Sequence, residues 1–119
     1  FMTTPVIIAL RAASHICFSL LGAVLIRKIP EIIEKPLPST VFNGGLAFVH
    51  ALAEVAVVSP FFLAGSIFKP EQLADGYVMS VLVLVGVGTF LHSLIDYTVS
   101  IMLWKPVRAA LPSLAELRE

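Results

Sequence analysis

Charge is scarce in this sequence. Only 13% of its 119 residues are charged, whereas 58% are hydrophobic, and the mean hydropathy is +0.96. A water-soluble domain carries about 25% charged residues, which cover its surface. The composition therefore excludes a soluble globular domain and predicts a protein whose solvent is a lipid bilayer.

The sequence also lacks an excess of one charge sign and a set of cysteines. Eight basic and eight acidic residues cancel to a formal charge of +0, so no basic field is available to attract nucleic acid. The single Cys17 excludes a disulfide framework and a cysteine-rich metal site within the chain. Residue 1 is Phe rather than Met, as processing of an imported organelle protein would leave it, and a trivial cause explains it equally well.

Long hydrophobic runs are what the sequence has instead. A membrane helix needs about 20 apolar residues, and three runs meet this length, at about 5–26, 41–66 and 77–104. We expect the second helix to begin after Pro36 and Pro38, and Lys105–Pro106 to end the third. The fold class is thus all-α, an integral membrane protein with three transmembrane helices, and residues 1–119 form a single transmembrane domain. Helical spacing in the C-terminal tail predicts a short amphipathic segment, through Val107, Leu111, Leu114 and Leu117.

Basic residues are distributed unevenly between the two sides of such a membrane domain. The first loop and the tail hold six of them, whereas the second loop holds only Lys69. The positive-inside rule therefore places the first loop and the C-terminus on the cytoplasmic or matrix side. This predicts a bacterial inner membrane or a mitochondrial inner membrane protein.

Each predicted span carries a histidine and an ionisable residue four positions apart. These pairs are Arg11 with His15, His50 with Glu54, and His92 with Asp96. Residues four apart share one face of a helix, and a charged side chain in hydrocarbon costs a few kcal/mol, at least about 2.5 on insertion scales. We therefore expect these residues to face an interface, a cofactor or a polar path rather than lipid.

Several roles suit such histidines. They can form hydrogen bonds that hold helices together, or ligate a porphyrin iron as neutral imidazoles. A quinone or proton path is a third role, and a metal site formed by the His50–Glu54 and His92–Asp96 turns is a fourth. For a heme, the candidate axial ligands are His50 and His15.

The stretch from Leu91 to Tyr97, LHSLIDY, resembles the membrane-anchor subunits of succinate dehydrogenase (complex II). Those anchors have three transmembrane helices, a His-x-x-x-Asp turn, and an Asp-Tyr pair whose tyrosine contacts ubiquinone; His92, Asp96 and Tyr97 match these features. The resemblance implies a ubiquinone site at Tyr97, Asp96 and His92, with Ser14 from the first span, and a heme b at His50 or His15. In this family, however, the heme-ligating histidine lies about two turns before these motifs, where this sequence has Val85, and the motif lies in the second helix rather than the third.

The leading functional hypothesis is a small integral membrane subunit of a respiratory electron-transfer complex. Such a chain is not an enzyme alone; it anchors a catalytic part and contacts lipids and the other membrane subunits of a hetero-oligomeric complex. The alternatives are a structural accessory subunit without a cofactor, and a pigment-binding photosynthetic subunit. Three spans alone could hardly shield six intramembrane polar groups, which also favours a membrane partner.

Overall fold

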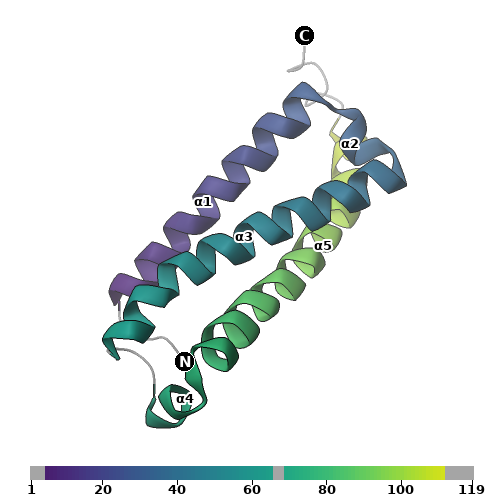
Figure 1. Ribbon diagram of the computed structural model, residues 1–119. Coiled ribbons are helices and arrows are strands. Elements are labelled where there is room, and N and C mark those ends of the chain that lie inside the picture. Colours follow the sequence, from purple (N-terminus) through teal and green to yellow (C-terminus); the bar gives the residue numbers. More distant parts are fainter. Residues whose placement is uncertain (1–4, 66–68, 112–119) are drawn as a thin grey trace.

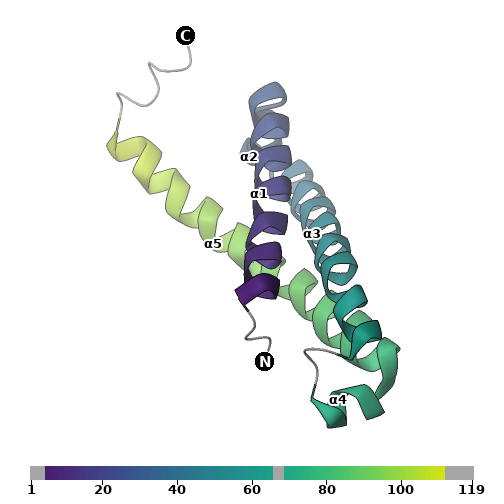
Figure 2. The ribbon, with the colours of Figure 1, turned by 90° about the vertical axis from the view of Figure 1, so that its left-hand side faces the viewer.

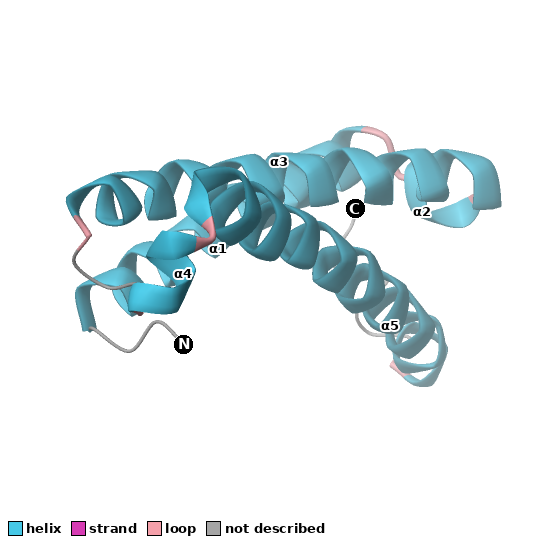
Figure 3. Cartoon of the chain, turned by 60° about the horizontal axis from the view of Figure 1, so that its bottom comes forward, coloured by secondary structure: helices cyan, strands magenta, loops and turns pink. Residues whose placement is uncertain are grey.

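The computed structural model describes residues 5–65 and 69–111, and every element in these two ranges is a helix (Figure 3). The long helices are α1 (Pro5–Lys28), α3 (Pro36–Ala64), and the continuous pair η1 (Val78–Val87) and α5 (Gly88–Ala110). Two short helices, α2 (Glu31–Glu34) and α4 (Pro70–Ala74), lie in the loops. Within the described ranges, three helices are long and apolar enough to cross a membrane. The predicted fold class of an all-α integral membrane protein is confirmed.

Prolines mark the helix ends differently from the sequence-based expectation. Helix α3 begins at Pro36, five residues earlier than expected, because a proline in the first helical turn lacks only an N–H that would have no helical acceptor. Helices α3 and α5 continue through Pro60 and Pro106. The expected stop at Lys105–Pro106 is thus wrong, and part of the tail belongs to α5; residues 112–119 lie outside the described ranges. Helix α3 ends instead at Gly65, whose positive φ of 64° suits a left-handed cap.

The third span does not begin as an α-helix. Residues Val78–Val87 form a π-helix, with hydrogen bonds that reach five residues back, before α5 takes over at Gly88. Such wide turns are rare, and they are found most often at functional sites. The apolar run predicts a helix here, but hydrophobicity alone does not distinguish the two helix types.

The three long helices splay apart toward one end. Helix α3 is the central element and contacts both α1 and the η1–α5 pair. Figure 1 shows α1 and α3 diverging toward α2, and Figure 2 shows α5 leaving both helices as it runs toward its C-terminus, so that the bundle is open near α2. We call the part formed by residues 27–35 and 105–108 the basic end.

The opposite end of the bundle is closed by apolar packing. Ile7, Val58, Val81 and Val85 form a buried core there. Gly86 allows the close approach of η1 to α3, since a Cβ at this position would lie 3.2 Å from Cγ2 of Val55. Lipid offers no hydrophobic drive for helix association, so this contact surface is what holds the closed end together.

Candidate functional site

An ion pair between a partly exposed arginine and a fully buried glutamate joins α1 to α3 inside the spans. Arg11 Nε donates to Oε2 of Glu54, whose side chain is 0% exposed. A carboxylate in such a place requires a compensating charge, because the interior cannot solvate it. Each charge therefore offsets the free-energy cost of placing the other inside the membrane. The pair also links two helices that are far apart in the sequence.

Three further polar residues surround Glu54. Ser14 Oγ lies 2.9 Å from Glu54 Oε1 and 2.7 Å from the Arg11 carbonyl oxygen. His15 Nδ1 donates to that same carbonyl oxygen at 2.8 Å, because a carbonyl can only accept. His50 Nε2 lies 3.7 Å from Glu54 Oε1. We call these five residues the intramembrane cluster: Arg11, Ser14, His15, His50 and Glu54.

The cluster could hold a metal ion by distance alone. Ligand atoms of His15, His50 and Glu54 all lie within 4.8 Å of one another. The carboxylate, however, is already engaged by Arg11 and Ser14, so a cation would have to displace the guanidinium that neutralises it. The charges of Arg11 and Glu54 already balance each other, and added positive charge in this low-dielectric setting is unfavourable.

The surroundings of His50 do not fit a porphyrin. Its ring stacks on Phe18 at a centroid distance of 4.1 Å and meets the His15 ring edge-on at 4.3 Å. Its Nε2 is buried and faces Glu54, which leaves no room for a macrocycle on that nitrogen. Heme binding at His50 or His15 stays a prediction that this arrangement does not support.

His50 also links the cluster to the third span. Its Nδ1 forms a hydrogen bond with the buried Ser93 Oγ of α5. This bond and the Arg11–Glu54 pair together connect all three long helices through polar groups inside the spans. One interpretation of the sequence was that these histidines form hydrogen bonds between helices. At His50 the structure contains such a bond.

We expect Ser93→Ala to lower the free energy of unfolding by about 1 kcal/mol, because His50 would lose its hydroxyl partner while remaining buried. Unfolding in mixed micelles with increasing SDS, followed by circular dichroism, measures this change. Ser100→Ala, at an exposed position two turns further along the same helix, is the control and should leave the stability unchanged. Equal losses in both variants would contradict the link.

A small pocket lies beside the cluster, between all three long helices. Its volume is about 240 Å³. We call it the three-helix pocket; it is lined by Phe18, Ser19, Asn43, Leu46, Ala47, Ser93, Asp96, Tyr97 and Ser100. Ser93 belongs to its wall and also bonds His50, so the pocket and the cluster adjoin. More than half of these lining residues are polar, which is unusual inside a membrane span.

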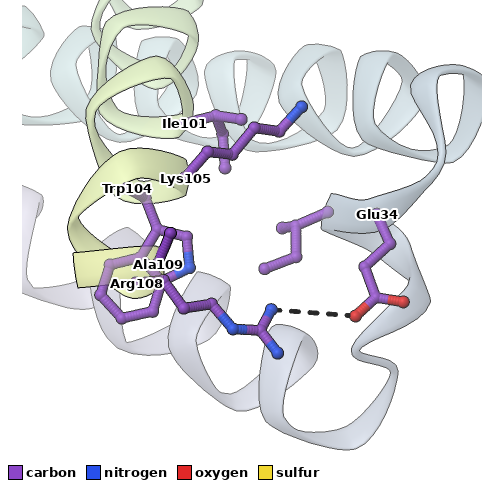
Figure 4. Close-up of a pocket in the computed structure, with 7 residues that line it drawn as sticks. Glu34, Ile101, Trp104, Lys105, Arg108 and Ala109 are labelled. Atoms are coloured by element: carbon purple, nitrogen blue, oxygen red, sulfur yellow. Dashed lines mark ion pairs between the residues drawn. The ribbon is translucent and has the colours of Figure 1, made fainter. Parts of the chain in front are cut away.

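Wider clefts lie between this region and the basic end. One cleft, of about 1020 Å³, shares Tyr97 and Ser100 with the three-helix pocket and extends to Arg27 and Trp104. A cleft of about 450 Å³ lies between α2 and the end of α5 (Figure 4). There Arg108 Nη1 lies 3.9 Å from Glu34 Oε1. The three-helix pocket thus shares part of its lining with a cleft at the open end of the bundle.

His92 and Asp96 occupy a different setting. Their side chains pair at 2.9 Å and are 66% and 62% exposed. Asp96 reaches the edge of the three-helix pocket, whereas no residue that the structure describes, other than His92, pairs with its carboxylate. In a bilayer this face of α5 requires a cover other than lipid.

Neither a protein-family model nor a solved structure matches the chain. The niacin transporter NiaX of Lactococcus lactis subsp. cremoris (strain MG1363), however, is 30% identical to it over 103 residues. The chain is similar to a niacin transporter. The matched residues make up 87% of this chain and 45% of NiaX, so the chain spans less than half the length of this relative.

This similarity corrects the functional hypothesis. The expected electron-transfer subunit is wrong, because NiaX is a transporter, and the accessory and photosynthetic alternatives gain no support from it either. The match extends over 87% of the chain, whereas the stretch that resembles succinate dehydrogenase anchors covers only a few residues. What remains of the hypothesis is an integral membrane protein.

The residues chosen from the sequence are only partly brought together. Asp96 and Tyr97 line one pocket and His92 pairs with Asp96, as a shared site requires, but Ser14 instead bonds Glu54. Arg11 and Glu54 were each assigned to a histidine on the same helix, and the structure pairs them with each other. Their opposite charges at similar expected depth are the signal that could have identified this pair. Nothing in the sequence around Asn43 distinguishes it from an ordinary asparagine near a loop.

Proposed function

We propose that this chain is part of a membrane transporter for a small aromatic carboxylate of the niacin type. The observation that carries the proposal is the similarity to NiaX over 87% of the chain. Nicotinate is a single ring that bears one negative charge at neutral pH. A transporter for it must offer polar groups in the spans, where the solute loses its hydration.

The geometry supports such a role in two ways. First, polar side chains from α1, α3 and α5 meet inside the spans, adjacent to a pocket and to clefts that reach the surface. Second, the charges at the two ends differ in sign. The basic end holds five basic and two acidic residues, a net charge of +3, whereas residues 69–77 hold one basic and two acidic residues. A positive rim concentrates anions at an opening.

The same charge difference supports an orientation with the basic end in the cytoplasm. A further polypeptide segment in the membrane is part of this proposal, because the paired side chains of His92 and Asp96 are exposed on α5. That polypeptide would cover the exposed pair and complete the transport unit.

We expect membranes from bacteria that lack niacin uptake to bind several-fold more radiolabelled nicotinate when the bacteria express this chain than when they carry the empty vector. Excess unlabelled nicotinate should suppress this binding, and succinate, which is a carboxylate without a ring, should not. Purified chain in nanodiscs should bind nicotinate saturably in equilibrium dialysis. Protein that is present in the membrane but shows no saturable nicotinate binding would refute the proposal.

A further inference from the structure

The cleft of about 1020 Å³ lies where α1 and α5 diverge (Figure 2). We call it the open-end cleft. Its walls come from the end of α1, from α2 and from the second half of α5, and they include Ala23, Ile26, Arg27, Ile33, Ile101 and Trp104. These side chains leave an open space between helices that are expected to lie in a bilayer.

The open-end cleft begins at the level of the lipid headgroups. Arg27 lies in the last turn of α1 and Trp104 lies near the end of the third span, and both line the same cleft. Tryptophan is enriched at the membrane–water interface, and basic residues flank the spans there. Tyr97, seven residues before Trp104, lies about 10 Å further into the membrane at 1.5 Å per residue. The cleft therefore extends from the headgroup level into the hydrocarbon.

Arg27 gives the mouth of the cleft an uncompensated positive charge. It is the one charged residue among the nine that line the cleft, and it forms no ion pair with the acidic residues that the structure describes. The two nearest acidic residues along the chain have other partners. Glu31 Oε2 lies 2.9 Å from Lys35 Nζ, and Glu34 Oε1 lies 3.9 Å from Arg108 Nη1. A free guanidinium suits a phosphate group, to which it can donate two parallel hydrogen bonds.

The deeper walls of the cleft are mainly apolar. Ile26, Ile33 and Ile101 come from three different helices and supply branched aliphatic surface. The adjoining cleft in Figure 4 shares Ile33, Ile101 and Trp104 with it and adds Lys105 at its edge. A small water-soluble anion could pair with Arg27 but would leave the isoleucines uncovered. An amphiphile with a negative headgroup and an aliphatic chain covers both parts.

We propose that the open-end cleft binds one anionic phospholipid from the leaflet at the basic end. Its phosphate accepts hydrogen bonds from Arg27, and one acyl chain lies against Ile26, Ile33 and Ile101. Basic pockets between membrane helices bind anionic headgroups in this way. The lipid would supply contacts between α1 and α5 where the two helices have separated. This inference goes beyond the proposed transport function and does not depend on it.

Trp104 allows a direct test, because it is the single tryptophan of the chain and it lines the cleft. The full chain is reconstituted in phosphatidylcholine vesicles that contain the same low fraction of either dibrominated phosphatidylglycerol or dibrominated phosphatidylcholine. Bromine atoms on the acyl chains quench tryptophan fluorescence at short range. The anionic lipid should quench Trp104 more strongly than the zwitterionic one, and the dependence of quenching on lipid fraction gives their relative affinity.

Two charge variants distinguish the cleft from a general surface charge. Arg27→Gln should lower the relative affinity for the anionic lipid about tenfold, which corresponds to one hydrogen bond to a charged group. Lys28→Gln removes the same charge at the neighbouring exposed position, which does not line the cleft, and should keep most of the preference. Equal quenching by both lipids in the wild type, or equal losses in the two variants, would overturn the proposal.

Two further measurements test the acyl-chain part of the cleft. Ala23→Phe fills the wall and should weaken quenching by the anionic lipid, whereas Val24→Phe, at the next exposed position outside the wall, should not. Glycerol 3-phosphate carries the phosphate without acyl chains, so an excess of it should leave the quenching unchanged. If it abolishes the preference for phosphatidylglycerol, the cleft binds free anions and the lipid assignment is wrong. Saturable nicotinate binding is measured separately and can persist in every one of these outcomes.

Discussion

Arg11→Met is expected to cause the largest loss of stability of any single substitution considered for this chain. It would leave the carboxylate of Glu54 buried without its guanidinium partner, and removal of one member of a buried ion pair costs about 3–5 kcal/mol. The Ser14 hydroxyl alone cannot replace the lost charge. Unfolding by SDS in mixed micelles, followed by circular dichroism, should show this loss of free energy.

The double variant Arg11→Met/Glu54→Gln distinguishes the ion pair from a general packing effect. It removes both charges and keeps an oxygen that can accept from Ser14, so we expect it to recover most of the stability that Arg11→Met loses. Interacting residues give non-additive effects in such a cycle, whereas independent ones add within about 0.5 kcal/mol. Additive losses in the double variant would show that Arg11 and Glu54 do not stabilise the bundle as a pair.

Gly22→Leu is expected to separate α1 from α3. Gly22 is buried, and a Cβ at this position would lie 3.2 Å from Cδ1 of Leu46. A leucine adds three more carbons at the same place, and such overpacking costs about 1–3 kcal/mol. The same unfolding measurement detects the loss, and weakened contact between the helices should also make the α1–α3 interface more accessible.

Gly44→Leu is the matched control for Gly22→Leu. It also replaces a helical glycine, but a Cβ there meets no atom of the described residues within 4 Å. Leucine is a better helix former than glycine by up to about 1 kcal/mol, so this variant should be as stable as the wild type or slightly more stable. A loss in Gly44→Leu as large as in Gly22→Leu would mean that the effect does not arise at the α1–α3 contact.

Much of the fold follows from composition. Three apolar runs of sufficient length determine the number of membrane helices, and the structure confirms all three. The helix ends were harder to predict, because Pro36 and Pro106 were read as helix boundaries. A proline ends a helix only where its missing N–H and its ring are not tolerated; Pro36 is in the first turn of α3, and the backbone of α5 continues past Pro106.

The candidate site was less predictable, for a physical reason. Spacing along one helix identifies side chains that share a face, as it does for His92 and Asp96. It carries no information about which faces of different helices meet. The pairing of Arg11 with Glu54 and the bond from His50 to Ser93 depend on how α1, α3 and α5 pack, and that packing requires coordinates.

The π-helix in the third span determines how α5 is turned about its own axis. In an α-helix each residue advances the chain by about 100° around the axis, but a wider turn accommodates more residues before the chain comes round again. Deleting one residue from Val78–Val87 would therefore rotate everything after it by roughly a quarter of a revolution relative to α3. Ser93 would then turn away from His50. The number of residues in η1, rather than the composition of α5, therefore determines which side chains of α5 face the bundle.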